Sequence, residues 1–307
     1  TITASNSGSN QDTGCGVYLA GYSTSAFENT TVTAPSTGIE IRAGRLTLTN
    51  CNVTGGSGKV TADANGNGTT VKNAALAISQ HTTKKPIDVT INGGTFTGTA
   101  PIYQTDVQGT GSSNVKAEVK NGQFNGAVSA ATDGTIAVSG GTFSSDVSDY
   151  LAKGFSLIAN SDGTFGVDRL NESNAAAVVN GTYYGTLAEA VGAAQDGQTV
   201  TVLKDLATAP VTTSAGITLD LDGHTLRIVS DTSGVAYGLQ FTAGTGVVKN
   251  GTVIDMRGEG KTAQNMIALN VTGATKVTTS SVEFQTYQPR TLASPYYNKV
   301  VELSDGG

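Results

Sequence analysis

The sequence predicts an all-β chain that winds as a parallel β-helix, a solenoid of stacked coils. The main observation is a short cassette: an apolar strand, a small polar turn, and then a second apolar residue. It occurs at Phe27–Val32, Leu48–Val53, Ile91–Phe96, Val119–Phe124 and Val138–Phe143. The last residues of these cassettes are 21, 43, 28 and 19 residues apart. We interpret the step of 43 as two ordinary steps with one degenerate copy between them, which gives a period typical of solenoids.

Composition and alternation are the second and third observations. Gly accounts for 40 of the 307 residues, Pro for only 6, and Trp is absent, so an ordinary mixed core is excluded. Apolar and polar residues nevertheless alternate in strand-length runs such as 217–221. A disordered chain has no reason to alternate in this way, so we expect a folded protein.

The cassette assigns its residues to the inside and the corners of each coil. Parallel strands lie about 4.8 Å apart, so inward positions favour apolar side chains of similar size, and tight corners favour Gly or Asn. Phe96, Phe124 and Phe143 share one place in the cassette, and we expect them to form a buried aromatic ladder. Residues 64–68 and 108–113 are too polar and Gly-rich for strands and are predicted to be projecting loops.

The chain divides into three predicted parts. Residues 1–145 are expected to form the C-terminal part of a first β-helix segment. Residues 146–178 are predicted to form a cap and junction, with a short helix over 146–154 and a hairpin turn at 160–163 that together cover the open strand edge. Residues 179–307 are predicted to be a second segment, truncated at its C-terminal end. It opens with a capping helix, because Thr186 and Glu189 have the spacing of a capping box.

Charge excludes two classes of partner. The net charge is −6 and the 18 Lys and Arg residues are scattered, with Lys84–Lys85 the nearest approach to a cluster, so we expect no nucleic-acid partner. No run reaches the roughly 18 apolar residues that span a bilayer, so we expect no membrane insertion within this sequence. Few Cys and Lys and many Thr and Asn are typical of exported bacterial surface proteins.

The two cysteines, Cys15 and Cys51, are 36 residues apart, which fits neither a metal site nor a redox pair. Whether they form a disulfide or remain free thiols is left open by the sequence, because a bridge requires neighbouring coils with suitable geometry.

Residues 179–190, followed by 196–205 and 217–226, resemble the start of a pectin-lyase-like right-handed parallel β-helix. Sequences of this form recur in large repetitive surface proteins of gut Gram-positive bacteria. In these proteins a cassette like 139–147 closes one β-helix before the next opens. The resemblance implies right-handed winding and two consecutive segments. It implies little about chemistry, because the superfamily includes lyases, hydrolases, adhesins and passive stalks.

Asp220 and Asp222 are the best carboxylate group, with His224 and Arg227 beside them. Lyases of this superfamily need carboxylates for Ca²⁺ and a base, and its hydrolases need grouped Asp residues. Alternation places both Asp side chains on the solvated face of a strand whose other face carries Leu219 and Leu221. The next coils, at 247–250 and 275–279, supply no second carboxylate, so we assign no catalytic role to this group.

Other polar and aromatic candidates have structural explanations. His81 has no Cys or second His nearby and is not expected to bind a metal. Asp255 and Arg257 are expected to form a structural ion pair, with each other or with a neighbouring coil. The candidates for stacking on a sugar ring are tyrosines, which also pack under caps at the ends of solenoids: Tyr183, Tyr184, Tyr287, Tyr296 and Tyr297.

These observations predict a non-catalytic structural or adhesive segment of an exported bacterial surface protein, extracellular or at the cell surface, that needs no cofactor or metal. Two alternatives stay open: a polysaccharide lyase or glycoside hydrolase of the pectate-lyase-like type, and a non-catalytic glycan-binding module. The expected partners are host or dietary glycans, surface proteins, and neighbouring β-helix segments of the same chain.

Overall fold

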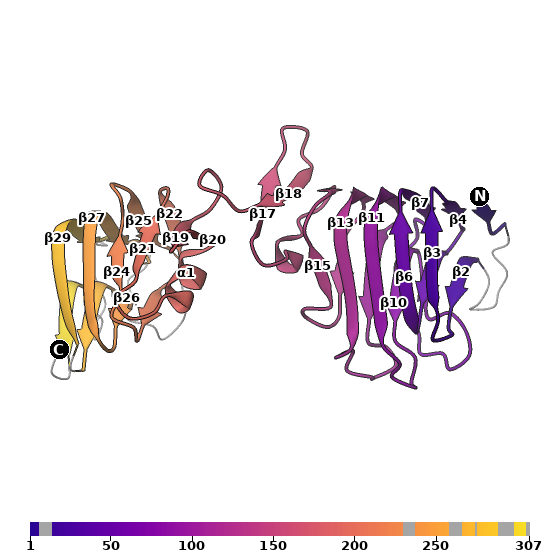
Figure 1. The fold of residues 1–307 in the computed structure, drawn as a ribbon, viewed down its shortest axis with the longest axis horizontal. Helices are drawn as coiled ribbons and strands as arrows, with labels where there is room; N and C mark the ends of the chain where they lie inside the picture. Colours follow the sequence, from indigo (N-terminus) through magenta and orange to yellow (C-terminus); the bar gives the residue numbers. More distant parts are fainter. Residues whose placement is uncertain (6–13, 230–236, 258–265, 274, 288–297, 305–307) are drawn as a thin grey trace. The chain divides into compact units, whose positions relative to one another are not determined.

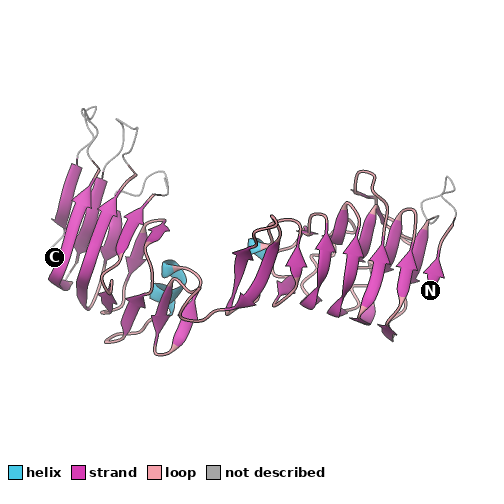
Figure 2. Ribbon diagram, turned by 90° about the horizontal axis from the view of Figure 1, so that it is seen from above, coloured by secondary structure: helices cyan, strands magenta, loops and turns pink. Residues whose placement is uncertain are grey.

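The computed structural model describes residues 1–5, 14–229, 237–257, 266–273, 275–287 and 298–304. The chain is all-β with predominantly parallel strand pairing, and it divides into two compact units, Thr1–Arg169 (unit 1) and Leu170–Gly307 (unit 2) (Figure 1). Within these described residues, helix is confined to two short segments (Figure 2).

Unit 1 is built from two sheets, one of 11 strands and one of five. The five-stranded sheet has the order β14-β12-β10-β5-β2, and a separate hairpin joins β8 and β9. The strands of the unit are β1 (Ile2–Thr3), β2 (Cys15–Leu19), β3 (Thr24–Glu28), β4 (Thr31–Thr33), β5 (Thr37–Ile41), β6 (Gly44–Thr49), β7 (Cys51–Thr54), β8 (Thr61–Ala62), β9 (Val71–Lys72), β10 (Ala74–Ser79), β11 (Ile87–Thr97), β12 (Ala100–Thr105), β13 (Val115–Asn125), β14 (Ser129–Ala130), β15 (Ile136–Val138), β16 (Thr142–Phe143), β17 (Phe155–Ala159) and β18 (Phe165–Arg169).

Each passage of the chain, here called a repeat, adds one strand to the five-stranded sheet and then one long or two short strands to the larger sheet. Strands β5, β6 and β7 make one repeat, and the next consists of β10 and the long β11. Parallel pairing places equivalent residues of successive repeats side by side, and their inward side chains form the core of the unit.

The predicted aromatic ladder is confirmed. Phe96 pairs in register with Phe124, and Phe124 with Phe143, across β11, β13 and β16. All three rings are at most 1% exposed. The ring centroids of Phe96 and Phe124 are 5.2 Å apart, and those of Phe124 and Phe143 are 4.7 Å apart, with nearly parallel planes.

The step of 43 residues is not a double repeat, and this prediction was wrong. Val53 pairs directly with Phe96, so no degenerate copy lies between β7 and β11. The additional residues, 55–73, instead leave the stack as an excursion that contains the antiparallel β8–β9 hairpin. The period therefore varies because loops between strands vary in length, while the strand register is kept.

The cassette corner depends on glycine. Gly94 has a φ of +106°, and a Cβ added there would lie 1.9 Å from the carbonyl oxygen of Cys51 in the preceding repeat. Only a residue without a side chain allows the two backbones to approach this closely.

The last repeat of unit 1 is covered by antiparallel elements. β18 pairs antiparallel with both β16 and β17, around the predicted hairpin turn at 160–163, which is confirmed. Tyr150, Leu157 and Phe165 pack against the core. The predicted helix over 146–154 is only a single 3-10 turn, η1 (Ser148–Tyr150), because Leu151 turns to extended backbone and bridges to Val138.

Unit 2 begins with an antiparallel hairpin and a helix and continues as parallel repeats. β19 pairs antiparallel with β20 and β21, whereas the later pairings in its sheets are parallel. Its elements are β19 (Ala177–Val179), β20 (Thr182–Tyr184), α1 (Leu187–Ala193), β21 (Thr199–Val202), β22 (Leu206–Thr208), β23 (Val211–Thr213), β24 (Thr218–Asp220), β25 (Thr225–Ile228), β26 (Tyr237–Phe241), β27 (Thr245–Asp255), β28 (Met266–Thr272), β29 (Lys276–Thr286) and β30 (Asn298–Ser304).

The predicted capping box is present at the start of α1. The Thr186 side chain accepts a hydrogen bond from the Glu189 backbone N–H, and the Glu189 carboxylate accepts one from the Thr186 N–H. Leu187, Ala190 and Val191 of this helix are buried in the core of unit 2. The helix thus covers the first repeat with one apolar face.

Two stretches of unit 2 also have the cassette pattern, 248–253 and 278–282, and their spacing suggests that Val253 lies beside Val282. In the structure Val253 instead pairs with Phe284, two residues further along β29. Asn250 and Ser281 are the equivalent corner residues, since both have positive φ. Ser at this corner gives a weaker sequence signal than Asn.

The structure joins neither Cys15 nor Cys51 in a disulfide. The Cys51 thiol is buried and donates to the Phe27 carbonyl oxygen, 3.3 Å away. The Cys15 thiol is half-buried and lies 3.2 Å from the Val17 carbonyl oxygen.

Candidate functional site

The carboxylate of Asp220 is held by the next repeat rather than left free. Its Oδ2 lies 2.9 Å from Lys249 Nζ, and its Oδ1 accepts hydrogen bonds from Asn250 Nδ2 at 2.9 Å and from the Asp222 N–H at 3.1 Å. Partial desolvation raises the pKa of Asp220, but these hydrogen bonds and the charge of Lys249 outweigh it, so the pKa lies below its ordinary value. Asp220 pairs with Lys249, which lies within the coil predicted at 247–250. The following repeat places Ser280 there, one residue beyond the predicted 275–279, and neither position is a carboxylate.

Asp222 is exposed and forms the turn after β24 together with Gly223, since both have positive φ. Leu219 and Leu221 are buried, as alternation predicted. Asp220 and Asp222 therefore do not share a cleft; one is an ion-pair partner and the other a turn residue.

His224 and Arg227 contact a carboxylate that the sequence reasoning missed. Asp205 Oδ1 lies 3.7 Å from His224 Nδ1, and Asp205 Oδ2 lies 3.5 Å from Arg227 Nη1. The Thr225 N–H donates to Asp205, and with Arg227 and His224 it holds the pKa of Asp205 below its ordinary value. Parallel pairing of β22 with β25 brings them together, so the missing signal was strand register.

His81 uses both ring nitrogens within the protein. Its Nδ1 accepts a hydrogen bond from the Thr83 N–H at 3.2 Å, which leaves Nε2 to donate to the Gly66 carbonyl oxygen at 2.9 Å. Over the described part of the chain, no group of three or more His, Cys, Asp or Glu residues has an arrangement that could hold a metal ion.

Asp255 and Arg257 form the predicted pair with each other. Arg257 donates through Nε to Asp255 Oδ1 at 2.9 Å and through Nη2 to Oδ2 at 2.7 Å, and both side chains are fully buried. The Ile267 N–H also donates to Asp255 Oδ2 at 3.1 Å. The pair therefore joins β27 to the following β28 and has no surface for a substrate.

Of the tyrosine candidates, Tyr184 packs against the core of unit 2, Tyr183 is half-buried, and Tyr287 is exposed. Tyr296 and Tyr297 lie outside the described residues.

A buried charged cluster under the 55–73 excursion was not predicted. Glu40 and Arg42 are fully buried although alternation places them on the outer face of β5 and just beyond it. Glu40 accepts hydrogen bonds from the N–H groups of Thr70 and Val71 and from the Thr70 hydroxyl, and Arg42 Nη1 donates to the Gly68 carbonyl oxygen at 2.6 Å. Burial raises the pKa of Glu40, and these hydrogen bonds and Arg42 offset the rise only in part.

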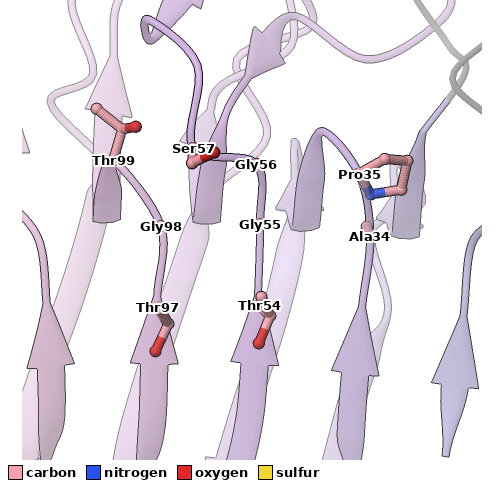
Figure 3. Close-up of a pocket in the computed structure, with 9 residues that line it drawn as sticks. All are labelled: Ala34, Pro35, Thr54, Gly55, Gly56, Ser57, Thr97, Gly98 and Thr99. Atoms are coloured by element: carbon pink, nitrogen blue, oxygen red, sulfur yellow. The ribbon is translucent and has the colours of Figure 1, made fainter.

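A shallow groove of about 630 Å³ lies at the corner where β4, β7 and β11 end (Figure 3). Backbone hydrogen bonds join the repeats beneath it, such as Gly55 N–H to the Thr97 carbonyl oxygen at 2.9 Å. A Cβ added to Gly55 would lie 2.1 Å from the Ala74 carbonyl oxygen, so the corner needs glycine to pack on β10. None of the lining residues is ionisable: Ala34, Pro35, Thr54, Gly55, Gly56, Ser57, Thr97, Gly98 and Thr99.

The groove adjoins an outward surface with no charged residue, here called the neutral face. Strand register aligns its members in two columns of five, opposite to the buried column that contains the aromatic ladder. The first column is Thr31, Asn52, Thr95, Gln123 and Thr142, and the second is Thr3, Thr33, Thr54, Thr97 and Asn125.

The comparisons with known proteins identify no relative. No protein-family model matches the chain, no curated protein matches it, and no solved structure matches it. Over the described residues, no helix is long and apolar enough to cross a bilayer.

Proposed function

We propose that the chain is a non-catalytic structural or adhesive segment of an exported bacterial surface protein, built from two right-handed parallel β-helices in succession. The repeated parallel register, the aligned inward columns and the antiparallel elements that flank the repeats support this architecture. Right-handed winding and surface location rest on the sequence resemblance described above.

One observation carries the non-catalytic part of the proposal. Three of the carboxylates discussed above bind structural partners: Asp220 binds Lys249, Asp255 binds Arg257, and Glu40 binds the excursion backbone. Asp222 is instead an exposed turn residue. The groove that could hold a polymer is lined by residues that cannot act as acid or base. Acid–base chemistry needs ionisable groups within reach of the bond that reacts.

The test is a cleavage assay on pectate, methylated pectin and host mucin glycans, with unsaturated uronates and new reducing ends as readouts. We expect no turnover by the wild-type protein. Wild-type cleavage that Asp220→Asn combined with Asp222→Asn abolishes would overturn the proposal and establish the lyase or hydrolase alternative.

A further inference from the structure

We infer that the neutral face of unit 1 binds an uncharged, extended polysaccharide whose sugars lie along the two columns. The inference rests on the proposed function, since it names the ligand of an adhesive segment. Two outward surfaces of unit 1 differ in their charge. The outward residues of β6 and of the first halves of β11 and β13 include charged side chains, with ion pairs from Arg45 to Asp88 at 3.3 Å and from Lys120 to Glu118 at 3.1 Å. The neutral face has none in ten positions.

The chemistry of the neutral face excludes other polymers. Nucleic acids and acidic polysaccharides need Lys or Arg at the contact, and the face and the adjoining groove offer neither. The centres of protein–protein interfaces are enriched in aromatic side chains and Met, which are also absent from the two columns. Hydroxyl and amide groups that both donate and accept hydrogen bonds remain, and these match the hydroxyl groups of a neutral glycan.

The geometry of the face is periodic and fixed. Neighbouring strands place equivalent residues about 4.8 Å apart down each column, and residues two apart on one strand separate the columns by roughly 6.6 Å. Seven of the ten residues are Thr, whose β-branched side chain has few rotamers in a strand, so the hydroxyl groups are held in place before a ligand binds. A hydrogen bond from Asn125 Nδ2 to Thr97 Oγ1, 3.1 Å long, fixes the second column further.

A polysaccharide along the columns would meet the same pair of groups at every repeat. Extended β-1,4-linked glycans advance by about one strand spacing per sugar, so each repeat can serve one sugar. Without aromatic rings to stack on, each contact is weak, and affinity grows with the number of repeats that one chain engages. The groove beside Thr54 and Thr97 gives the sugars a shallow concave edge (Figure 3).

The test uses isothermal titration of the whole chain with cellohexaose and mannohexaose, with the matching trisaccharides and a hexamer of galacturonate for comparison. We expect at least one neutral hexasaccharide to bind, at least tenfold more tightly than its trisaccharide, and the galacturonate hexamer not to bind. Replacing two hydroxyls without changing shape, in Thr54→Val with Thr97→Val, should weaken binding about tenfold, the effect of losing roughly two hydrogen bonds.

The matched control is Thr47→Val with Thr90→Val. These residues are also partly exposed threonines on adjacent paired strands, but on the charged surface. We expect this control to change neutral-glycan affinity by less than twofold. The inference is overturned if neither neutral hexasaccharide binds, if the galacturonate hexamer binds as tightly, or if both double variants have the same effect. Each of these outcomes, without cleavage, overturns the inference but leaves the proposed function intact, whereas cleavage in the assay above overturns the proposed function itself.

Discussion

Removal of the central ring of the aromatic ladder should destabilise unit 1 strongly. Phe124 is fully buried and is the middle ring of the ladder. Its ring centroid lies 5.2 Å from that of Phe96 and 4.7 Å from that of Phe143. Phe124→Ala therefore loses transfer free energy, leaves a cavity and breaks two stacked contacts worth about 0.5–1.5 kcal/mol each. Together these effects should lower the free energy of unfolding by about 3–5 kcal/mol.

The assay is native-state hydrogen exchange measured by mass spectrometry across a denaturant series, because it reports each unit separately. Peptides from β11 and β13 should lose protection, and peptides from unit 2 should serve as an internal reference with no change. Tyr22→Ala is the control, since Tyr22 is 60% exposed and its loss should cost no more than about 0.5 kcal/mol. A cost below about 1 kcal/mol for Phe124→Ala would refute the ladder as a major source of stability.

Three further predictions test other features. Limited proteolysis should cut first between residues 160 and 174, because the exposed hairpin turn and the polar boundary between the units lie there. Early cuts within β11 or β13 would contradict this prediction. The folded-state pKa of Glu40 is raised, so its contribution to stability is greatest below its ordinary pKa of 4.5 and falls as the pH rises above that value. The difference in stability between wild type and Glu40→Gln should therefore change as the pH rises from below to above 4.5. A difference that stays constant with pH would contradict the raised pKa of Glu40. Arg257→Met should lower the free energy of unfolding of unit 2 by about 3–5 kcal/mol, because it leaves Asp255 buried and unpaired. Thermal unfolding should show that a second change, Asp255→Leu, restores most of this loss.

The sequence was sufficient for features that depend on neighbouring residues or on the repeat itself. The aromatic ladder followed from one shared cassette position, and the capping box followed from the spacing of Thr186 and Glu189. The hairpin at 160–163 followed from its turn residues. In each case the local pattern and the tertiary packing favour the same structure.

Features that depend on length and register were beyond the sequence. The step of 43 residues was interpreted as two repeats, because spacing alone does not separate a degenerate repeat from a long excursion. Residues 64–68 within it were correctly predicted to be a loop, which lies between β8 and β9. Alternation alone would place Glu40 and Arg42 in solvent, but both are buried under the excursion, and a single sequence does not show which surface a loop will cover. Asp205 was missed as the partner of His224 and Arg227 because their contact needs the register of two strands.

The excursion also shows how this chain can acquire new surface without losing its framework. β7 pairs with β11 in regular parallel register although residues 55–73 lie between them in the sequence. The pairing of these strands therefore does not depend on the length of the excursion. The entropy of closing such a connection grows only slowly with length. Foreign peptides grafted near Asn67, at the exposed tip of the excursion, should therefore be displayed with little loss of stability, whereas a single residue inserted into β11 would turn every later side chain of that strand to the opposite face.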